Sequence, residues 1–438
     1  MASSSSEIGA AIIKAGASGD LKQLKAIRNK VNDEWEFRKI CDEYSDFSTG
    51  RTVLHHAVGI GHFEICKFLI NSVGVCINAL TYKRDTPLAE AAKGEHVKIA
   101  EFLVKHDAKI SIPNIEGLTA LHYAALNGNR ELVELLVMAG AFIDADSADG
   151  TPLQISISRG NVETVKFLLS HGSKPEFSCA VVDTPLICAV KSRSFECMRL
   201  LLEATANPNF YHAGLNTLAS AVKEGDTKFL KYLLKAKADP NSSNKDIYKP
   251  IEEAAMVHNR AAVEILFPVT ERLAHYPNWT VDGIMKGVHS EQFKTMIEKR
   301  MTRRLTALDL GGLRDASNKD YYRAIYKYRL ASYVDPSNTT WISKRSLWEA
   351  CMGKCMHALL DAEKWIRLKP ELPVPIPHHG GDSAASVNEI FKKFLYAGLA
   401  LSLDPYNEAI CDAFRVTLFG YFAWLIQMSS PDEILRFS

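Results

Sequence analysis

Residues 117–137 read GLTALHYAALNGNRELVELLV, and their spacing decides the fold because it recurs before and after this stretch. One such unit predicts a helix, a turn and a second helix. A helix pair of this size cannot bury its own apolar face, so it requires stacked neighbours of the same kind. The places where those neighbours occur in the sequence therefore determine the fold class.

The unit returns every 32 to 34 residues. The position of Thr119 is filled, in chain order, by Thr52, Thr86, Thr119, Thr151, Thr184, Asn216 and Lys249. Each unit has leucine or isoleucine two residues later and alanine or serine five residues later. The small residue predicts close approach of the first helices of neighbouring units. A leucine on each second helix predicts a shared core, and this set is Leu69, Leu103, Leu136, Leu168, Leu201, Leu233 and Leu266.

Glycine marks the turn between the two helices of most units, where a positive φ costs glycine little. The turn glycines are Gly61, Gly128, Gly160 and Gly225. An earlier unit with Ile12, Ala15, Gly19 and Ile27 fits the same spacing, but 42 residues separate it from the unit of Thr52. Extra residues near 32–48 are expected to lengthen this connection, which makes the first unit an atypical terminal one.

The opening of the units resembles a known signature. It reads TVLHHA at 52–57, TPLA at 86–89, TALH at 119–122, TPLQ at 151–154 and TPLI at 184–187. These segments resemble the Thr-Pro-Leu-His-x-Ala motif of ankyrin repeats. The resemblance implies that His55 and His122 brace the first helix by hydrogen bonds. A role as metal ligands is disfavoured, because no carboxylate or cysteine accompanies both at ligand spacing.

The resemblance also implies a protein-binding surface formed by hairpin tips and the exposed face of the first helices. The candidate partner-binding residues are Tyr82, Arg84, Glu116, Asp149, Val181, Val182, Tyr211 and His212. The tips share no single charge sign, and the last four residues make the later tips more apolar and favour a hot spot there. The alternative is that tip residues vary because they have no role.

A second kind of repeat follows Pro268, where the first period ends. Its spacing is given by Ala324, Tyr328, Ala331 and Pro336, then by Ala358, Ala362, Trp365 and Pro370, and in part by Ala397, Ala400 and Pro405. This small-large-small alternation with a terminal proline resembles the tetratricopeptide repeat (TPR), a pair of antiparallel helices.

One subclass of that family binds the acidic C-terminal tail of a heat-shock chaperone through a clamp of lysine, arginine and asparagine side chains. Arg314, Asn318 and Lys344 match three of the clamp positions in part. The last two positions have no counterpart, because residues 371–381 contain three prolines and cannot form a regular helix. The resemblance therefore implies at most a partial clamp.

The expected fold is all-α, an ankyrin-repeat solenoid followed by a degenerate TPR-like region. About eight ankyrin units are expected over residues 7–276, the first and last atypical. A linker helix is expected over 277–304, TPR-like repeats over 305–415 with an incomplete third unit, and an atypical tail over 416–438.

The composition and the net charge do not favour binding to nucleic acid or to a membrane. The 438 residues carry 52 basic and 51 acidic side chains, and the cluster at Lys299, Arg300, Arg303 and Arg304 is expected to be a solvated helix face. The longest late apolar run, residues 416–428, is shorter than the roughly 20 residues that span a bilayer. Nine irregularly spaced cysteines and the absence of a secretory pattern favour the cytoplasm, with the nucleus as the alternative.

The sequence shows no arrangement of residues that is typical of a catalytic or ligand-binding site. Residues 144–150 place their third acid and their glycine one residue late for a calcium loop. Cys351, Cys355 and His357 lack the second pair that a zinc site needs. We therefore expect no enzyme, no metal and no cofactor.

The favoured hypothesis is a non-enzymatic adaptor that binds other proteins through the ankyrin concave surface. The alternative is a co-chaperone that recruits a heat-shock chaperone tail through the partial clamp. Chains that combine these repeat types in this order resemble plant proteins.

Overall fold

The computed structural model describes residues 2–31, 33–147, 149–176, 183–210, 216–243 and 247–352, together with residues 357, 358, 361, 364 and 368. Its contacts divide the chain into two compact units. Unit 1 comprises residues 1–212 and 220–239, and unit 2 comprises residues 213–219 and 240–438, so the division passes through helix α14 (Thr217–Glu224). The secondary-structure elements in the described part are all helical, which confirms the all-α prediction there.

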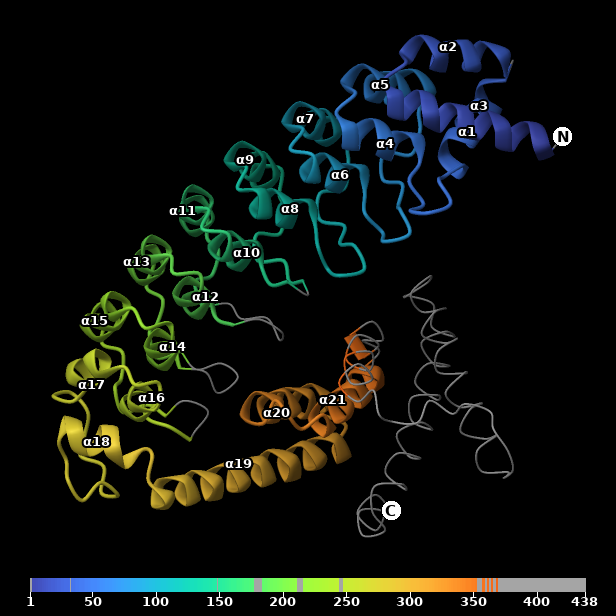
Figure 1. Ribbon diagram of the computed structural model, residues 1–438. Helices are drawn as coiled ribbons and strands as arrows, with labels where there is room; N and C mark the ends of the chain where they lie inside the picture. The colour runs from blue at the N-terminus through green and yellow to red at the C-terminus, as the bar shows by residue number, and fades with distance from the viewer. Residues whose placement is uncertain are drawn as a thin grey trace, which may run out of the picture. The chain divides into compact units, whose positions relative to one another are not determined.

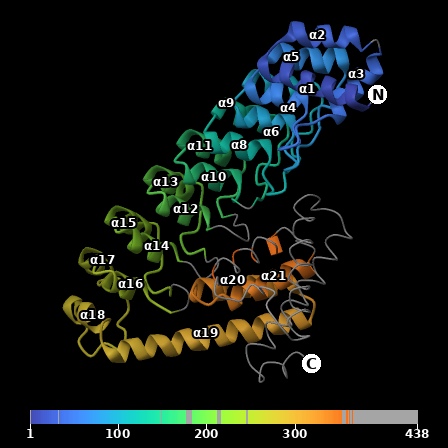
Figure 2. The same cartoon turned by 45° about the vertical axis from the view of Figure 1, so that its right-hand side comes forward.

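Unit 1 is built from helix pairs in two rows. Figure 1 and Figure 2 show the first helices side by side in one row and the second helices in another, and each helix contacts the next one in its own row. The first row contains α4 (Val53–Ile60), α6 (Pro87–Lys93), α8 (Ala120–Asn127), α10 (Pro152–Ser158) and α12 (Pro185–Lys191). The second row contains α5 (Phe63–Phe68) with the π-turn η1 (Leu69–Val73), α7 (Val97–Lys105), α9 (Arg130–Met138), α11 (Val162–Ser170) and α13 (Phe195–Glu203), and α15 (Thr227–Lys235) is the last second helix of unit 1.

Each first helix begins where its threonine caps it. The Thr86 hydroxyl accepts a hydrogen bond from the Ala89 N–H at 3.1 Å, and the Thr184 hydroxyl accepts one from the Ile187 N–H at 3.2 Å. Pro87 and Pro185 follow directly, at a position where a helix N–H has no acceptor to lose. The Thr-Pro pair of the motif is therefore a helix start signal.

The turn between the paired helices has the predicted conformation. Gly61 has φ 96° and Gly128 has φ 73°, both in the left-handed region that favours glycine. Where the equivalent residue is Glu95, it takes φ 58°. The geometry of the turn is therefore kept even where glycine is missing, at a cost to the local backbone.

The repeated leucines and small residues form the core, as predicted. Leu136, Leu168 and Leu201 on the second helices are completely buried. Ala91 and Ala124 on the first helices are completely buried too, so neighbouring first helices approach closely. Each pair thus covers the apolar face of the next, which an isolated pair could not do.

The N-terminal connection holds an additional helix. Between α2 (Leu21–Lys30) and α4, helix α3 (Glu34–Glu43) begins at Asp33, whose carboxylate accepts a hydrogen bond from the Trp35 N–H at 2.9 Å. It buries Phe37 and Cys41 and contacts α1 (Ala2–Ser18), α4 and η1. The extra residues near 32–48 therefore include an ordered helix that packs against both of the first two helix pairs.

Unit 2 begins with α16 (Pro250–Met256), α17 (Arg260–Leu266) and α18 (Val281–Gly287), which contact one another. Glu252 of α16 is completely buried, accepts a hydrogen bond from the Lys249 N–H at 2.8 Å and lies 2.8 Å from Nε2 of His275. Arg300 donates to the Ile247 carbonyl at 2.8 Å, which ties the next helix to the segment that precedes α16.

That next helix, α19 (Glu291–Ser317), is continuous and includes residues 304 and 305, where the sequence suggested a boundary between linker and repeat. It is joined through residues 318–320 to α20 (Tyr321–Val334), which packs against it and against α21 (Thr340–Cys351). Ala324, Tyr328 and Ala331 of α20 are completely buried, so the small-large-small spacing lies at a helix interface. The expected third repeat and the tail over 416–438 lie outside the described residues.

Candidate functional site

The hairpins that precede the first helices have a tightly bonded backbone. The Tyr82 N–H donates to the Thr49 carbonyl at 3.0 Å, and the Ile115 N–H donates to the Lys83 carbonyl at 3.0 Å, so neighbouring hairpins are linked. Within one hairpin, the buried Asn114 side chain accepts from the N–H groups of Glu116 and Leu118, both at 2.9 Å. The tips are therefore held in place by main-chain and buried groups.

The side chains at several of these tips point into solvent. Tyr82 is 51% exposed, and Glu116 and Asp149 are exposed as well. Arg84 is half-buried and has a positive φ of 63°. The other four residues that the sequence singled out, Val181, Val182, Tyr211 and His212, lie outside the described residues.

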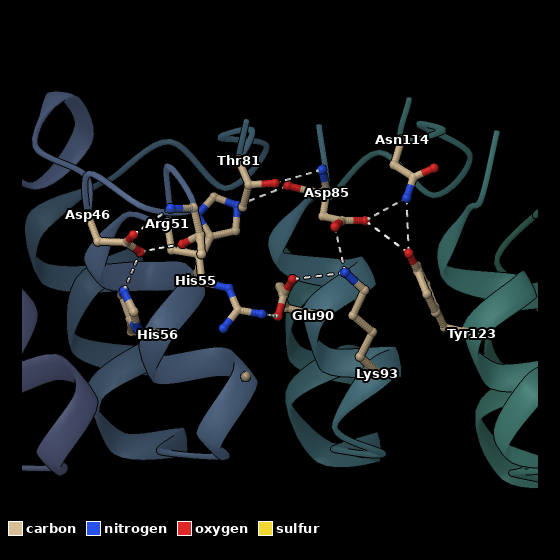
Figure 3. A network of polar contacts seen from close by, with 12 residues as sticks. Asp46, Arg51, His55, His56, Thr81, Asp85, Glu90, Lys93, Asn114 and Tyr123 are labelled. Carbon is tan, nitrogen blue, oxygen red and sulfur yellow. Dashed lines mark hydrogen bonds and ion pairs between the residues drawn. The ribbon is translucent and has the colours of Figure 1, made fainter. Parts of the chain in front are cut away.

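A buried polar network connects the hairpins to the first helices, and sequence reasoning missed it (Figure 3). Asp85 is 4% exposed, and its carboxylate lies 2.5 Å from Nζ of Lys93. The same carboxylate accepts hydrogen bonds from the Asn114 amide at 3.1 Å and the Tyr123 hydroxyl at 3.2 Å. Burial, together with the negative charge of Asp85, raises the pKa of the Tyr123 hydroxyl, which therefore stays protonated and remains a donor.

The network continues through Glu90, which is buried on α6. Its carboxylate lies 2.6 Å from a guanidinium nitrogen of Arg51 and 3.1 Å from Nζ of Lys93. Two cations and two carboxylates thus balance, as buried charges require. This set could hardly be recognised from the sequence, since Arg51 and Glu90 are 39 residues apart.

The two motif histidines have the predicted bracing role. Nδ1 of His122 accepts from the Thr119 N–H at 2.9 Å, and its Nε2–H donates to the Ala145 carbonyl at 3.1 Å. His55 makes the same pair of contacts with Thr52 and the Asp85 carbonyl. Burial lowers the pKa of each ring to about 4, so both are neutral at pH 7 and neither nitrogen is available to a ligand.

A groove of about 310 Å³ lies between α8 and α10. Its wall combines aliphatic and polar side chains, and its rim carries one acid and one base; the lining residues are Leu118, His122, Tyr123, Leu126, Asp149, Ile155, Ser158 and Arg159. The groove contains one candidate from the sequence, Asp149. His122 belongs to the motif and braces the helix, and the remaining lining residues carried no functional signal in the sequence.

The residues of the partial TPR clamp lie in unit 2 and differ in their availability. Arg314 and Asn318 are exposed at the end of α19. Lys344 of α21 is half-buried, and its Nζ lies 2.8 Å from a carboxylate oxygen of Asp309. The same Nζ is 5.7 Å from the centre of the Tyr328 ring. Lys344 is therefore already neutralised by a neighbouring acid.

Neither a metal centre nor a membrane-spanning helix is present among the described residues. No group of three or more histidine, cysteine, aspartate or glutamate side chains there is arranged to hold a metal ion. In the same part of the chain, every helix is too short or too polar to cross a lipid bilayer.

Part of this chain is similar in sequence to known proteins. The chain is 34% identical over 151 residues to the human transient receptor potential cation channel subfamily A member 1, a match that covers 33% of this chain and 14% of the channel. It is 28% identical over 197 residues to the rice probable E3 ubiquitin-protein ligase XBOS32, covering 38% of each chain. The chain thus spans well under half the length of these relatives.

Among solved structures, the human ASB11 ankyrin repeat domain matches 51% of this chain and the whole of that domain, with 25% identity and a TM-score of 0.45. A family model described as ankyrin repeats (3 copies) matches residues 12–114, 110–179 and 175–244. Together these segments cover more than half of the 438 residues and include the hairpins, histidines and groove described above. The chain therefore belongs to the ankyrin-repeat family.

Proposed function

We propose that this chain is a non-enzymatic adaptor that binds a partner protein with the hairpin tips and the exposed face of the first helices of unit 1. One observation carries the proposal: the hairpin backbones are fixed by hydrogen bonds to one another, while Tyr82, Glu116 and Asp149 leave their side chains in solvent. A fixed frame with exposed side chains loses little entropy on binding. Repeat stacks use such extended surfaces for recognition.

The proposal is tested by proximity labelling in living cells with the full chain fused to a labelling enzyme. The tip variant combines Tyr82→Ala, Glu116→Lys and Asp149→Lys. The matched control carries the same kinds of change on exposed second-helix residues, Glu101→Lys, Glu134→Lys and Met138→Ala.

The tip variant is expected to lose most of the proteins that the unchanged chain labels, and the control is expected to keep them. Thermal unfolding of both purified variants verifies that they fold. If the two variants label the same set of proteins as the unchanged chain, the tips are not the binding surface and the proposal fails.

Unit 2 supplies the second arm of the proposed adaptor through the helices α19, α20 and α21. The interface around Ala324, Tyr328 and Ala331 supports the TPR-like interpretation of this region. A clamp for a chaperone tail has weaker support, because Lys344 would have to leave Asp309 to bind a carboxylate. Titration with an acidic chaperone-tail peptide tests it, and the absence of saturable binding below millimolar concentration would exclude it.

The compartment proposed for this adaptor is the cytoplasm, with the nucleus as the alternative. Cys41 and Cys66 are buried, and burial raises the pKa of each thiol to about 12. Such protonated, enclosed thiols suit a reducing environment. Fluorescence microscopy of the tagged full chain distinguishes the two compartments.

A further inference from the structure

The volume and the lining residues of the groove between α8 and α10 determine which kind of peptide segment can bind there. Its volume of about 310 Å³ is at the lower end of the range for ligand pockets, roughly 300–1,000 Å³. One large side chain and the adjoining main chain fill a space of that size. Leu118, Leu126 and Ile155 contribute aliphatic surface to its wall.

The polar side chains in the wall are already hydrogen-bonded within the protein. The Ser158 hydroxyl donates to the Gln154 carbonyl at 2.9 Å. Both ring nitrogens of His122 are hydrogen-bonded, and burial lowers its pKa to about 4, so it offers neither a charge nor a free acceptor at pH 7. The Tyr123 hydroxyl donates to Asp85, as Figure 3 shows. A polar ligand group placed deep in the groove would lose its water without gaining a partner. The wall therefore selects an apolar side chain.

The rim carries two charges that the protein leaves unmatched. Among the residues that the structure describes, neither the Arg159 guanidinium nor the Asp149 carboxylate forms an ion pair, and both residues are exposed. Asp149 lies in the hairpin that precedes α10, and Arg159 follows the last residue of that helix. The seven residues of α10 rise by about 10 Å, so the two charges mark opposite ends of the groove.

An extended chain rises about 3.3 Å per residue and its alternate side chains face the same side, so positions i, i+2 and i+4 face the groove together and span about 13 Å. We infer that the groove binds an extended segment of a partner protein in which a large apolar residue lies midway between an acidic and a basic residue four positions apart. The acidic residue faces Arg159, the basic residue faces Asp149, and the apolar side chain contacts Leu118, Leu126 and Ile155. This inference rests on the proposed function, since it names the chemistry of the partner of the same face.

The test is selection of a random twelve-residue peptide library, displayed on phage, against the full chain. The expected consensus has leucine, isoleucine, methionine or phenylalanine midway between an acid and a base that are four positions apart. Selection against Arg159→Glu is expected to replace the acidic position by lysine or arginine. Lys166→Glu is the matched control, because it makes the same charge change in the same repeat, on the exposed face of α11.

A groove-filling variant tests the apolar site separately. Ser158→Phe adds a ring to an exposed position in the groove wall and is expected to weaken the best selected peptide at least tenfold. A consensus without an apolar residue, or one that is unchanged against Arg159→Glu, overturns the inference. An affinity that Ser158→Phe leaves unchanged overturns it as well.

The library and the cell experiment separate two kinds of failure. If the tip variant loses partners in cells while selection yields no such consensus, the protein-binding function stands and the inferred groove chemistry is wrong. If selection yields the consensus and its Arg159→Glu inversion while the tip variant, which carries Asp149→Lys, keeps all its partners, the groove binds such peptides in isolation but does not bind the partners labelled in cells, and the proposed tip surface is wrong.

Discussion

The histidine of the motif acts through both of its ring nitrogens. His122 accepts from the N–H of its own N-cap residue and donates to a carbonyl of the following hairpin, and so fixes the helix start relative to the next repeat. Gln154 does the same in the next unit, where its Oε1 accepts from the Thr151 N–H and its Nε2 donates to the Asp183 carbonyl. The requirement is therefore one acceptor and one donor in fixed places, which a neutral imidazole and an amide both meet.

This bonding predicts that the chain loses stability as the pH falls from about 6.5 to 4. Burial lowers the pKa of His55 and His122 to about 4, so in this window the unfolded chain binds protons that the folded chain does not. Stability must then rise with pH up to about 6.5 and level off above it. A shift of this size corresponds to on the order of 3 kcal/mol for each histidine. Urea unfolding at pH 4.5 to 7.5 measures the slope.

The double variant His55→Gln and His122→Gln is the control for this pH dependence. Glutamine keeps both hydrogen bonds, as Gln154 does, but does not titrate. The variant is therefore expected to remain folded and to show a flatter slope between pH 4.5 and 6.5. If its slope equals that of the unchanged chain, the histidines are not the source of the pH dependence.

At the scale of helices, the buried charge of Glu90 joins α6 to the segment that precedes α4. Glu90 is 3% exposed and contacts both Arg51 and Lys93. Glu90→Gln keeps the shape but removes the charge, and is expected to cost about 2 kcal/mol of unfolding free energy. Glu101→Gln on α7 is the matched control. Its partner Lys105 is exposed, so the expected cost is below about 0.5 kcal/mol.

Equal midpoints of urea unfolding for these two glutamine variants would contradict the assignment of Glu90 as a linking residue. The expected loss of unfolding free energy for Glu90→Gln is only about 2 kcal/mol, because the charged ends of Arg51 and Lys93 are partly exposed and water can solvate them.

In unit 2, the pairing of α19 with α20 depends on the absence of a side chain at Gly312. A Cβ built there would lie 2.7 Å from the Tyr328 ring, which is completely buried and cannot move away. Alanine normally stabilises a helix interior by about 1 kcal/mol relative to glycine. Gly312→Ala is nevertheless expected to destabilise unit 2 by about 1–2 kcal/mol, because the clash at a packed interface exceeds that gain.

The adjacent Gly311 supplies the control for this substitution. A Cβ at Gly311 meets the end of the flexible Lys327 side chain, which can shift. Gly311→Ala is therefore expected to be neutral or stabilising in thermal unfolding. A stabilising effect of Gly312→Ala would show that α19 and α20 are not packed through Tyr328.

At the scale of the whole molecule, the stability of each repeat depends on its contacts with the adjacent repeats in the stack. Leu136→Ala removes a completely buried side chain of α9 and is expected to cost about 2–5 kcal/mol. Hydrogen exchange of the full chain should accelerate in α9 and in its contact neighbours α7, α8 and α11. Exchange in α19, α20 and α21 of unit 2 is expected to stay unchanged. Uniform acceleration over both units would contradict this local coupling.

The regular parts of the molecule could be predicted from the sequence because their determinants are local and periodic. The threonine cap, the turn glycine and the buried leucine each act within one repeat or between adjacent repeats, and a fixed period displays all three. The bracing role of His55 and His122 followed from the same motif and is confirmed by their contacts. The insertion before Thr52 was visible only as extra length, since nothing periodic marked it as the helix α3.

What the sequence by itself determined is therefore the ankyrin fold of residues 12–244, its hairpins and the bracing role of the motif histidines. Only the tertiary structure decided which side chains at non-periodic positions come into contact or line the same groove. Arg51, Glu90 and Asp85 meet through stacking, and Tyr123, Asp149 and Arg159 line one groove. Side chains at non-periodic positions come together only when neighbouring repeats pack, so their chemistry cannot be read along a single chain.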